Sequence, residues 1–109
     1  MKKTTYNEAA PFIQPQYEIM TYFEESMPLE YLKLIRVEIA PGARVPAEGF
    51  SCHTEDEYSY FVEGELYTES GDFKGICSKG DFSIIPLGEE HWCENRTDKP
   101  CVIFVAMAK

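Results

Sequence analysis

Turn-forming residues divide this sequence at short and nearly regular intervals. Groups rich in glycine, proline and asparagine recur from the middle of the chain to its end, in the segments APG, VEG, ESGD, SKGD, PLGEE and NRTDKP. The stretches between them are short and rich in Val, Ile, Tyr and Phe, which strands favour. Short strands joined by tight turns are typical of a β-sandwich or barrel. We therefore predict an all-β fold, in one domain because 109 residues suit one core.

One segment, SMPLEYLKLIRVEIAPG, fits two structures. As a helix it would be capped by Ser26 and would place Leu29, Leu32 and Ile35 on one face. As a strand it would alternate, with its even-numbered residues on one face and its odd-numbered residues on the other. The β-branched residues toward its end favour the strand. The odd-numbered set is Tyr31, Lys33, Ile35, Val37 and Ile39.

The expected organisation is an N-terminal arm over residues 1–28 and a single barrel over residues 29–109. Within the arm, the segment YEIMTYF has the composition of a strand. It would lie either at the edge of a sheet or on a partner chain.

The balance of charge excludes two classes of partner. The chain has 19 acidic and 10 basic residues, a formal net charge of −9. Nucleic acids and anionic membrane surfaces would repel such a protein, so neither is expected as a partner.

No apolar run approaches the ~18 residues of a membrane span. The first residues, MKKTTYNEAAPFIQ, also lack the apolar core of a secretory signal, so we expect a cytoplasmic protein.

The four cysteines give little support for a structural zinc site. They form no C-x-x-C pair, which argues against a zinc ribbon. Their even number leaves disulfides open, although the expected reducing compartment argues against them. The cysteines are Cys52, Cys77, Cys93 and Cys101.

The chain has only two histidines, His53 and His91, and an acidic residue, Glu57, follows the first. Residues two or four apart on an extended chain face the same way, so His53 and Glu57 would share a face. Two histidines and one carboxylate converging from two strands would suit Fe(II) and other divalent ions. From spacing alone, ordinary surface or core histidines remain an alternative. Three further residues are expected to face the same cavity: Ser51, Phe61 and Cys93.

At these residues the sequence resembles the cupin superfamily. The second motif of that family runs Gly, five residues, Pro-x-Gly, two residues, His, three residues, Asn. It is matched in full here, by Gly80, Pro86, Gly88, His91 and Asn95. The resemblance implies a double-stranded β-helix of the jelly-roll type, with two packed sheets.

The first cupin motif runs Gly, five residues, His-x-His, three or four residues, Glu, six residues, Gly. His53, Glu57 and Gly64 match its second histidine, its glutamate and its closing glycine. Ser51 stands where the first histidine is expected, and Val45 stands at the opening glycine. Serine is a poor ligand for the borderline divalent ions that imidazole suits.

The resemblance therefore implies a three-ligand set, His53, Glu57 and His91, for a divalent ion such as iron, manganese, nickel, cobalt or zinc. Three accounts of the missing ligand remain open. Water or substrate fills its position, or another group such as Glu48 or Cys93 replaces it. In the third account the site has lost its metal and binds its ligand by hydrogen bonds.

Two other side chains have alternative roles. Arg36 lies among apolar residues and could enter the barrel to pair with an anionic ligand. The alternative is an exposed face or a structural ion pair. Cys93 could act as a functional thiol or as a small buried hydrophobic residue.

We interpret the protein as a small cupin-type metalloprotein, an enzyme that acts on a small polar metabolite. The resemblance allows dioxygenase, isomerase, lyase or hydrolase chemistry and assigns no catalytic residue. The alternative is a non-enzymatic binder of a sugar or other small molecule, with or without a metal. A third hypothesis, a structural or partner-binding domain, would gain support if side chains such as Phe61 and Met107 filled the cavity. Family members are often homodimers, so a homodimer is expected here.

Overall fold

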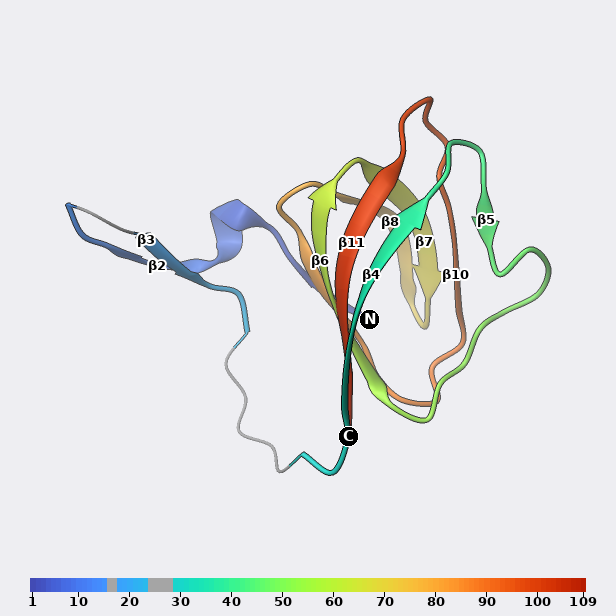
Figure 1. The fold of residues 1–109 in the computed structure, drawn as a ribbon, viewed down its shortest axis with the longest axis horizontal. Coiled ribbons are helices and arrows are strands. Elements are labelled where there is room, and N and C mark those ends of the chain that lie inside the picture. Colours follow the sequence, from blue (N-terminus) through green and yellow to red (C-terminus); the bar gives the residue numbers. More distant parts are fainter. Residues whose placement is uncertain (16–17, 24–28) are drawn as a thin grey trace.

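The computed structural model describes residues 1–15, 18–23 and 29–109, and these residues are almost entirely strands and turns (Figure 1). This confirms the predicted all-β class. The helical structure that it describes is one short 3-10 turn, η1 (Tyr6–Glu8). None of the described segments is a helix with the length and apolarity needed to cross a membrane. The strands are β1 (Lys2–Thr4), β2 (Ala10–Ile13), β3 (Glu18–Thr21), β4 (Leu32–Ile39), β5 (Arg44–Val45), β6 (Asp56–Glu63), β7 (Glu65–Ser70), β8 (Phe73–Ser78), β9 (Phe82–Ile85), β10 (His91–Glu94) and β11 (Cys101–Ala108).

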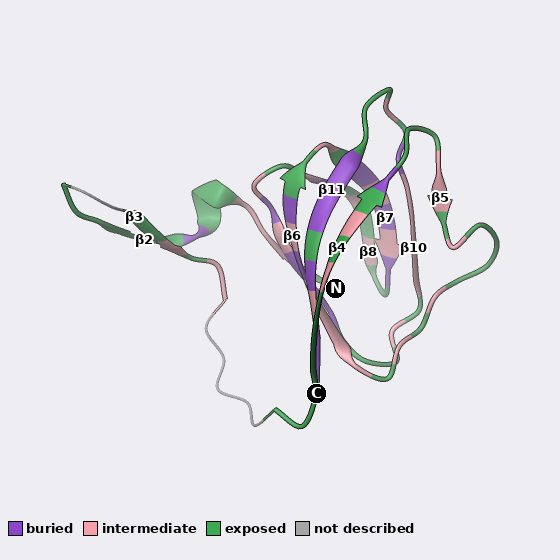
Figure 2. Ribbon diagram, viewed as in Figure 1, coloured by how far each residue is buried: buried purple, intermediate pink, exposed green. Residues whose placement is uncertain are grey.

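Two antiparallel sheets face each other across the core. One has the strand order β1-β9-β6-β11-β4 and the other has the order β5-β10-β7-β8. Strand β11 lies between β6 and β4 in the larger sheet, and most of its residues are buried (Figure 2). The predicted jelly-roll arrangement in two sheets is therefore present. The core cluster consists of Ile39, Phe61, Leu66, Cys77, Cys101, Ile103, Val105 and Met107.

The segment that fitted either a helix or a strand contains β4. Strand β4 pairs with β11 along its whole length, so this segment is a strand as predicted. Its odd-numbered side chains face the interior, where Ile35 and Val37 pack on the core cluster. The even-numbered Leu32 and Leu34 are 54% and 58% exposed on the other face. Ser26, the cap of the helical alternative, lies outside the described residues.

The N-terminal residues contribute to the barrel and then leave it. Strand β1 pairs with β9, so the first residues of the chain lie at the edge of the larger sheet. Strands β2 and β3 then form a two-stranded hairpin that projects away from the barrel (Figure 1). The predicted strand in YEIMTYF corresponds to β3, while Tyr17 lies outside the described residues.

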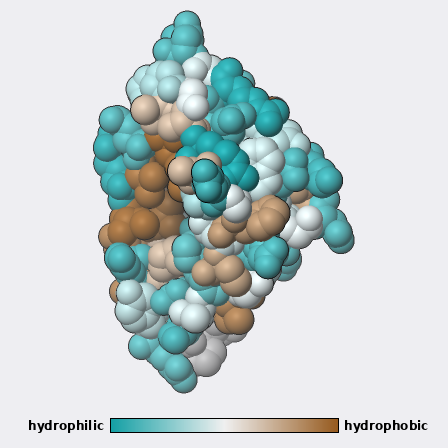
Figure 3. Space-filling model, turned by 90° about the vertical axis from the view of Figure 1, so that its right-hand side faces the viewer, coloured by the Kyte–Doolittle hydropathy of each residue, from teal (hydrophilic) through white to brown (hydrophobic). Residues whose placement is uncertain are grey.

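The outer face of the larger sheet carries an open apolar pocket of about 580 Å³. It lies between this face and the segment that contains β3. Seen from the β5 and β10 side, most of the surface is hydrophilic and apolar side chains gather in one area at the left (Figure 3). The residues that line the pocket are Met20, Thr21, Tyr22, Phe23, Leu29, Leu32, Tyr58, Phe82, Ile84, Ala106 and Ala108.

Candidate metal centre

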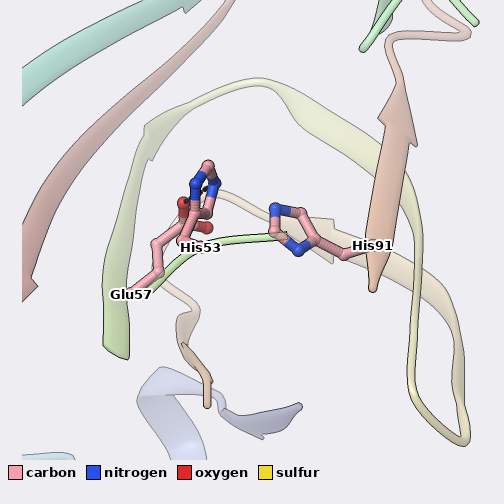
Figure 4. A group of neighbouring side chains, drawn as sticks. All are labelled: His53, Glu57 and His91. Atoms are coloured by element: carbon pink, nitrogen blue, oxygen red, sulfur yellow. Dashed lines mark ion pairs between the residues drawn. The ribbon is translucent and has the colours of Figure 1, made fainter. Parts of the chain in front are cut away.

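Three side chains from both sheets converge inside the barrel (Figure 4). His53 comes from the loop before β6, Glu57 from β6, and His91 begins β10. One potential ligand atom from each residue lies within 4.8 Å of the other two. His53 Nε2 is 3.7 Å from Glu57 Oε1, and the two imidazole ring centroids are 5.0 Å apart. In the described part of the chain, no fourth His, Cys, Asp or Glu joins this group.

Backbone hydrogen bonds hold the two histidine segments against each other. Ser51 and His91 exchange both of their backbone N–H···O bonds, at 2.8 and 3.0 Å. The Gly88 N–H also donates to the His53 carbonyl, at 2.9 Å. Gly88 has a φ of +78°, in the left-handed region that glycine adopts without strain. The Pro86–Gly88 turn therefore positions both histidines, which explains its place in the motif.

The orientation of the His91 ring leaves one nitrogen available to the centre. Its Nδ1 lies 3.0 Å from the Glu89 backbone carbonyl. Because a carbonyl only accepts, Nδ1 must donate, and in the neutral ring Nε2 then carries the free lone pair. Figure 4 shows that the other ring nitrogen of His91 points toward His53 and Glu57. A backbone contact of this kind is a common second-sphere partner of a metal-binding histidine.

Glu89 is itself held in place by two donors. The Met1 amino group donates to Glu89 Oε2 at 2.6 Å, and the Ser70 hydroxyl donates to the same atom at 2.7 Å. Partial burial acts to raise the pKa of Glu89, but these two bonds outweigh it and the pKa lies below its usual value. The carboxylate therefore stays charged and anchors the turn that precedes His91.

Asn95, the last residue of the motif, is fully buried and has a structural role. Its Nδ2 donates to the carbonyls of Ile39 and Lys99, at 3.0 and 2.7 Å. Its Oδ1 accepts from the backbone N–H and the hydroxyl of Thr97, at 3.0 and 2.7 Å. This side chain joins the end of β4 to the loop between β10 and β11.

The donor set fits a divalent ion. Two imidazoles and one carboxylate match the facial arrangement found for Fe(II) and related ions, with coordination positions left for water or substrate. His53 and Glu57 are 38% and 20% exposed, so the group is open to solvent on one side.

Two of the other predicted cavity residues, Ser51 and Cys93, lie close to the centre. Ser51 lies directly opposite His91, and cross-strand partners point to the same face of a sheet. Cys93 lies two residues beyond His91 and packs against the core cluster. Burial, and to a lesser extent the charge of Glu57, raises the pKa of the Cys93 thiol to about 11, so it is protonated at neutral pH.

Arg36 and Phe61 are not brought to the centre. Arg36 is an even-numbered residue of β4, 64% exposed, and its guanidinium lies 3.5 Å from Glu38. Arg36 therefore lies on an exposed face, beside Glu38. Phe61 is 4% exposed and is part of the core cluster.

A small open cavity of about 240 Å³ lies beside the three residues. His53 and Glu57 contribute to its lining, whereas His91 does not. Lys33, Tyr31 and Glu55 also line this cavity, and they were not predicted to do so from the sequence. The alternation along residues 31–39 was the available signal, but it did not reveal which set faces inward. The lining residues are Tyr31, Lys33, Ile35, His53, Glu55, Glu57 and Met107.

Comparison with known proteins decides the family. Residues 35–107, which contain most of the barrel and all three converging side chains, match the family described as Cupin domain. The chain belongs to the cupin family. Among curated proteins, it is 39% identical over 44 residues to an acireductone dioxygenase from Alcanivorax borkumensis. That match covers 37% of this cupin and only 24% of the dioxygenase.

Solved structures share its fold. The TT1209 protein of Thermus thermophilus superposes with a TM-score of 0.63 at 22% identity, covering 80% of this chain and 77% of that one. A sugar phosphate isomerase of the cupin superfamily from Silicibacter pomeroyi gives a TM-score of 0.61 at 26% identity, covering 72% of this chain and 50% of that one. At this level of identity the likeness concerns the fold of the barrel.

Proposed function

We propose that this cupin is a metal-dependent enzyme that acts on a small polar metabolite. The observation that carries the proposal is the convergence of His53, Glu57 and His91, with ligand atoms within 4.8 Å of one another. These three residues would hold a divalent ion, iron, manganese, nickel, cobalt or zinc. When bound, such an ion supplies a Lewis acid with open coordination positions.

The chain's own residues would prepare this site in two ways. The Glu89 carbonyl holds His91 in the tautomer that offers Nε2, and the Gly88 N–H fixes the segment that carries His53. The cavity of about 240 Å³ beside His53 and Glu57 would receive the metabolite. This volume corresponds to roughly eight water molecules at about 30 Å³ each, so the metabolite would be small.

The two named relatives support an enzyme but differ in reaction. One is called a dioxygenase and the other a sugar phosphate isomerase. The chain spans about a quarter of the dioxygenase and half of the isomerase, so each activity belongs to a larger protein. The proposal is therefore metal-assisted chemistry on a small polar substrate, and it does not specify the type of reaction.

Elemental analysis of untagged protein tests the proposal directly. The wild type should contain close to one equivalent of a single divalent metal, and His91→Ala should lose it. The matched control is Glu90→Ala, which removes an exposed acid beside His91. A wild type that stays metal-free after reconstitution with each candidate ion would overturn the proposal.

A metal-free binder is the second candidate, and one contact favours it. His53 Nε2 and Glu57 Oε1 lie 3.7 Å apart and can pair with each other without an ion. A barrel of this kind would hold a sugar or other small molecule through hydrogen bonds. The elemental analysis separates the two candidates, because only the enzyme requires the ion.

We also propose that the protein is a homodimer. The hairpin exposes apolar side chains, with Phe12, Ile13 and Ile19 at 52%, 67% and 50%. An isolated two-stranded hairpin is marginally stable in water, so a second copy would stabilise it. Light scattering coupled to size exclusion should give twice the chain mass, and removing residues 10–21 should give a monomer.

The cytoplasm is the proposed compartment. All four cysteines are free thiols, and three of them are at least partly buried. Unpaired cysteines suit a reducing environment. Thiol titration of freshly purified, denatured protein should find four reactive groups per chain.

A further inference from the structure

A cross-strand row connects Lys33 to the candidate metal centre. In the larger sheet, Lys33 of β4 lies opposite Met107 of β11, and Met107 lies opposite Glu57 of β6. Directly paired residues point to the same face, so all three side chains face the barrel interior. Adjacent strands are about 4.8 Å apart, which puts the Lys33 and Glu57 backbones at roughly 10 Å. A lysine side chain can therefore extend over a ligand held at Glu57.

Lys33 is the basic residue among those that line this cavity. It lines the cavity with His53 and Glu57. In the described part of the chain, no acidic group lies within ion-pair distance of its ammonium. Arg36, three residues later on the same strand, lies on the opposite face beside Glu38. Lys33 is exposed where the cavity opens, so its ammonium can reach an anionic ligand that enters from solvent.

The charge of the loaded cavity also favours an anion. Lys33 contributes +1, and Glu55 and Glu57 contribute −1 each. A divalent ion contributes +2, so the sum is +1 with neutral histidines. The whole chain, by contrast, carries −9. The cavity would therefore be a local positive region in an acidic protein, and it would attract small anions into a site of limited volume.

We propose that Lys33 binds the second acidic group of a small dicarboxylate whose first carboxylate meets the His53–Glu57–His91 centre. This inference rests on the proposed function and names its substrate class. A carboxylate is favoured over a phosphate because Lys33 is a single cation, and a phosphate dianion would leave one charge unmatched. Tyr31, which also lines the cavity, adds a hydroxyl donor near Lys33.

Calorimetric titration with malonate and malonamate tests this role. Malonamate replaces one carboxylate by a neutral amide of similar size. Wild-type protein loaded with Co²⁺ should prefer malonate, and Lys33→Met should bind malonate about threefold to tenfold more weakly, as expected for one partly solvated charge-assisted contact. Lys33→Met should bind malonamate as the wild type does, and Lys33→Arg should restore part of the preference.

The matched control is Arg36→Met, which removes a cation from the outer face of the same strand. Arg36→Met should leave malonate affinity unchanged. If the overall charge of the protein controlled binding, this variant would also weaken malonate binding. Metal affinity should be the same in all of these proteins. If Lys33→Met binds the metal and malonate as tightly as the wild type, the role of Lys33 is wrong and the metal centre stands.

The titration is repeated without metal so that the two proposals can fail separately. If no metal binds but malonate still binds through Lys33, the enzyme proposal is wrong and the anion site remains. If neither metal nor malonate binds to the wild type, both proposals are overturned.

Discussion

The two faces of the larger sheet each carry a pocket, and the two pockets differ in kind. The outer pocket is the larger, at about 580 Å³, and its lining is mainly apolar and aromatic. The inner cavity is less than half that size, yet it holds a lysine, two glutamates and a histidine. Chemistry requires polar groups that converge on one point, and a large apolar surface does not supply them. The smaller cavity is therefore the better candidate for catalysis.

Metal binding should depend on the inner face alone. Glu57→Gln should weaken metal affinity by about 100-fold or more, because an amide replaces a charged ligand. Competition with a chromophoric chelator measures this change. The free energy of unfolding of the metal-free protein should change by less than about 1 kcal/mol, because the His53–Glu57 pair is partly solvated.

Glu55→Gln is the matched control for this variant, because Glu55 lines the same cavity without joining the three converging residues. It should keep wild-type metal affinity. Equal losses in both variants would mean that the cavity acts through its overall charge, and the ligand assignment would be wrong.

The outer face should show the opposite behaviour. Phe82 contacts the rings of Tyr22, Phe23 and Tyr60, with centroids 5.5 to 5.9 Å away. Phe82→Ala should lower the free energy of unfolding by about 2 kcal/mol, less than for a fully buried phenylalanine. Chemical denaturation measures this loss, and metal affinity should stay within about threefold of the wild type. A large loss of metal affinity would mean that the two faces are coupled through the sheet.

The sequence predicted the barrel better than it predicted which face each side chain would take. Short β-rich segments and the motif from Gly80 to Asn95 were sufficient for the fold and for His91. The partial first motif supplied His53 and Glu57. Alternation along β4 was also visible, but its phase depends on pairing with β11, which no local pattern reveals. For that reason Arg36 was considered as the inward cation, whereas the structure places Lys33 there.

Other features depend on contacts that are distant in sequence. Asp56 belongs to neither sequence motif, yet its Oδ1 accepts from the Leu87 N–H at 2.8 Å and supports the turn before His91. Strand β1 and Asp56 both take their positions from partners far along the chain, β9 and Leu87. Composition alone could not have placed them.

Restoring the missing histidine should strengthen metal binding at the inner site. Ser51 lies opposite His91 and shares its face, so a histidine there could reach the ion. Ser51→His should raise metal affinity by about tenfold, a modest gain because a water ligand is replaced. It should also reduce the water-proton relaxation enhancement of the Mn²⁺-loaded protein. Unchanged affinity and relaxation would mean that position 51 does not face the ion.

The smallest expected effect concerns the core between the two sheets, where three thiols are at least partly shielded from water. Burial raises the pKa of Cys77 and Cys93 to about 11 and that of Cys101 to about 12. Unfolding returns these thiols to about 9, so above that pH the unfolded state binds fewer protons than the folded state. Stability should therefore be unaffected by these groups below about pH 9 and should decrease as the pH rises from 9 toward 11.

Denaturation midpoints across this pH range measure the decrease in stability. Cys77→Ala should reduce the slope of this decrease, whereas Cys52→Ala, at an exposed thiol, should not. An equal slope in both variants would mean that the interior is wetter than its burial indicates, which would weaken the contrast between the two faces.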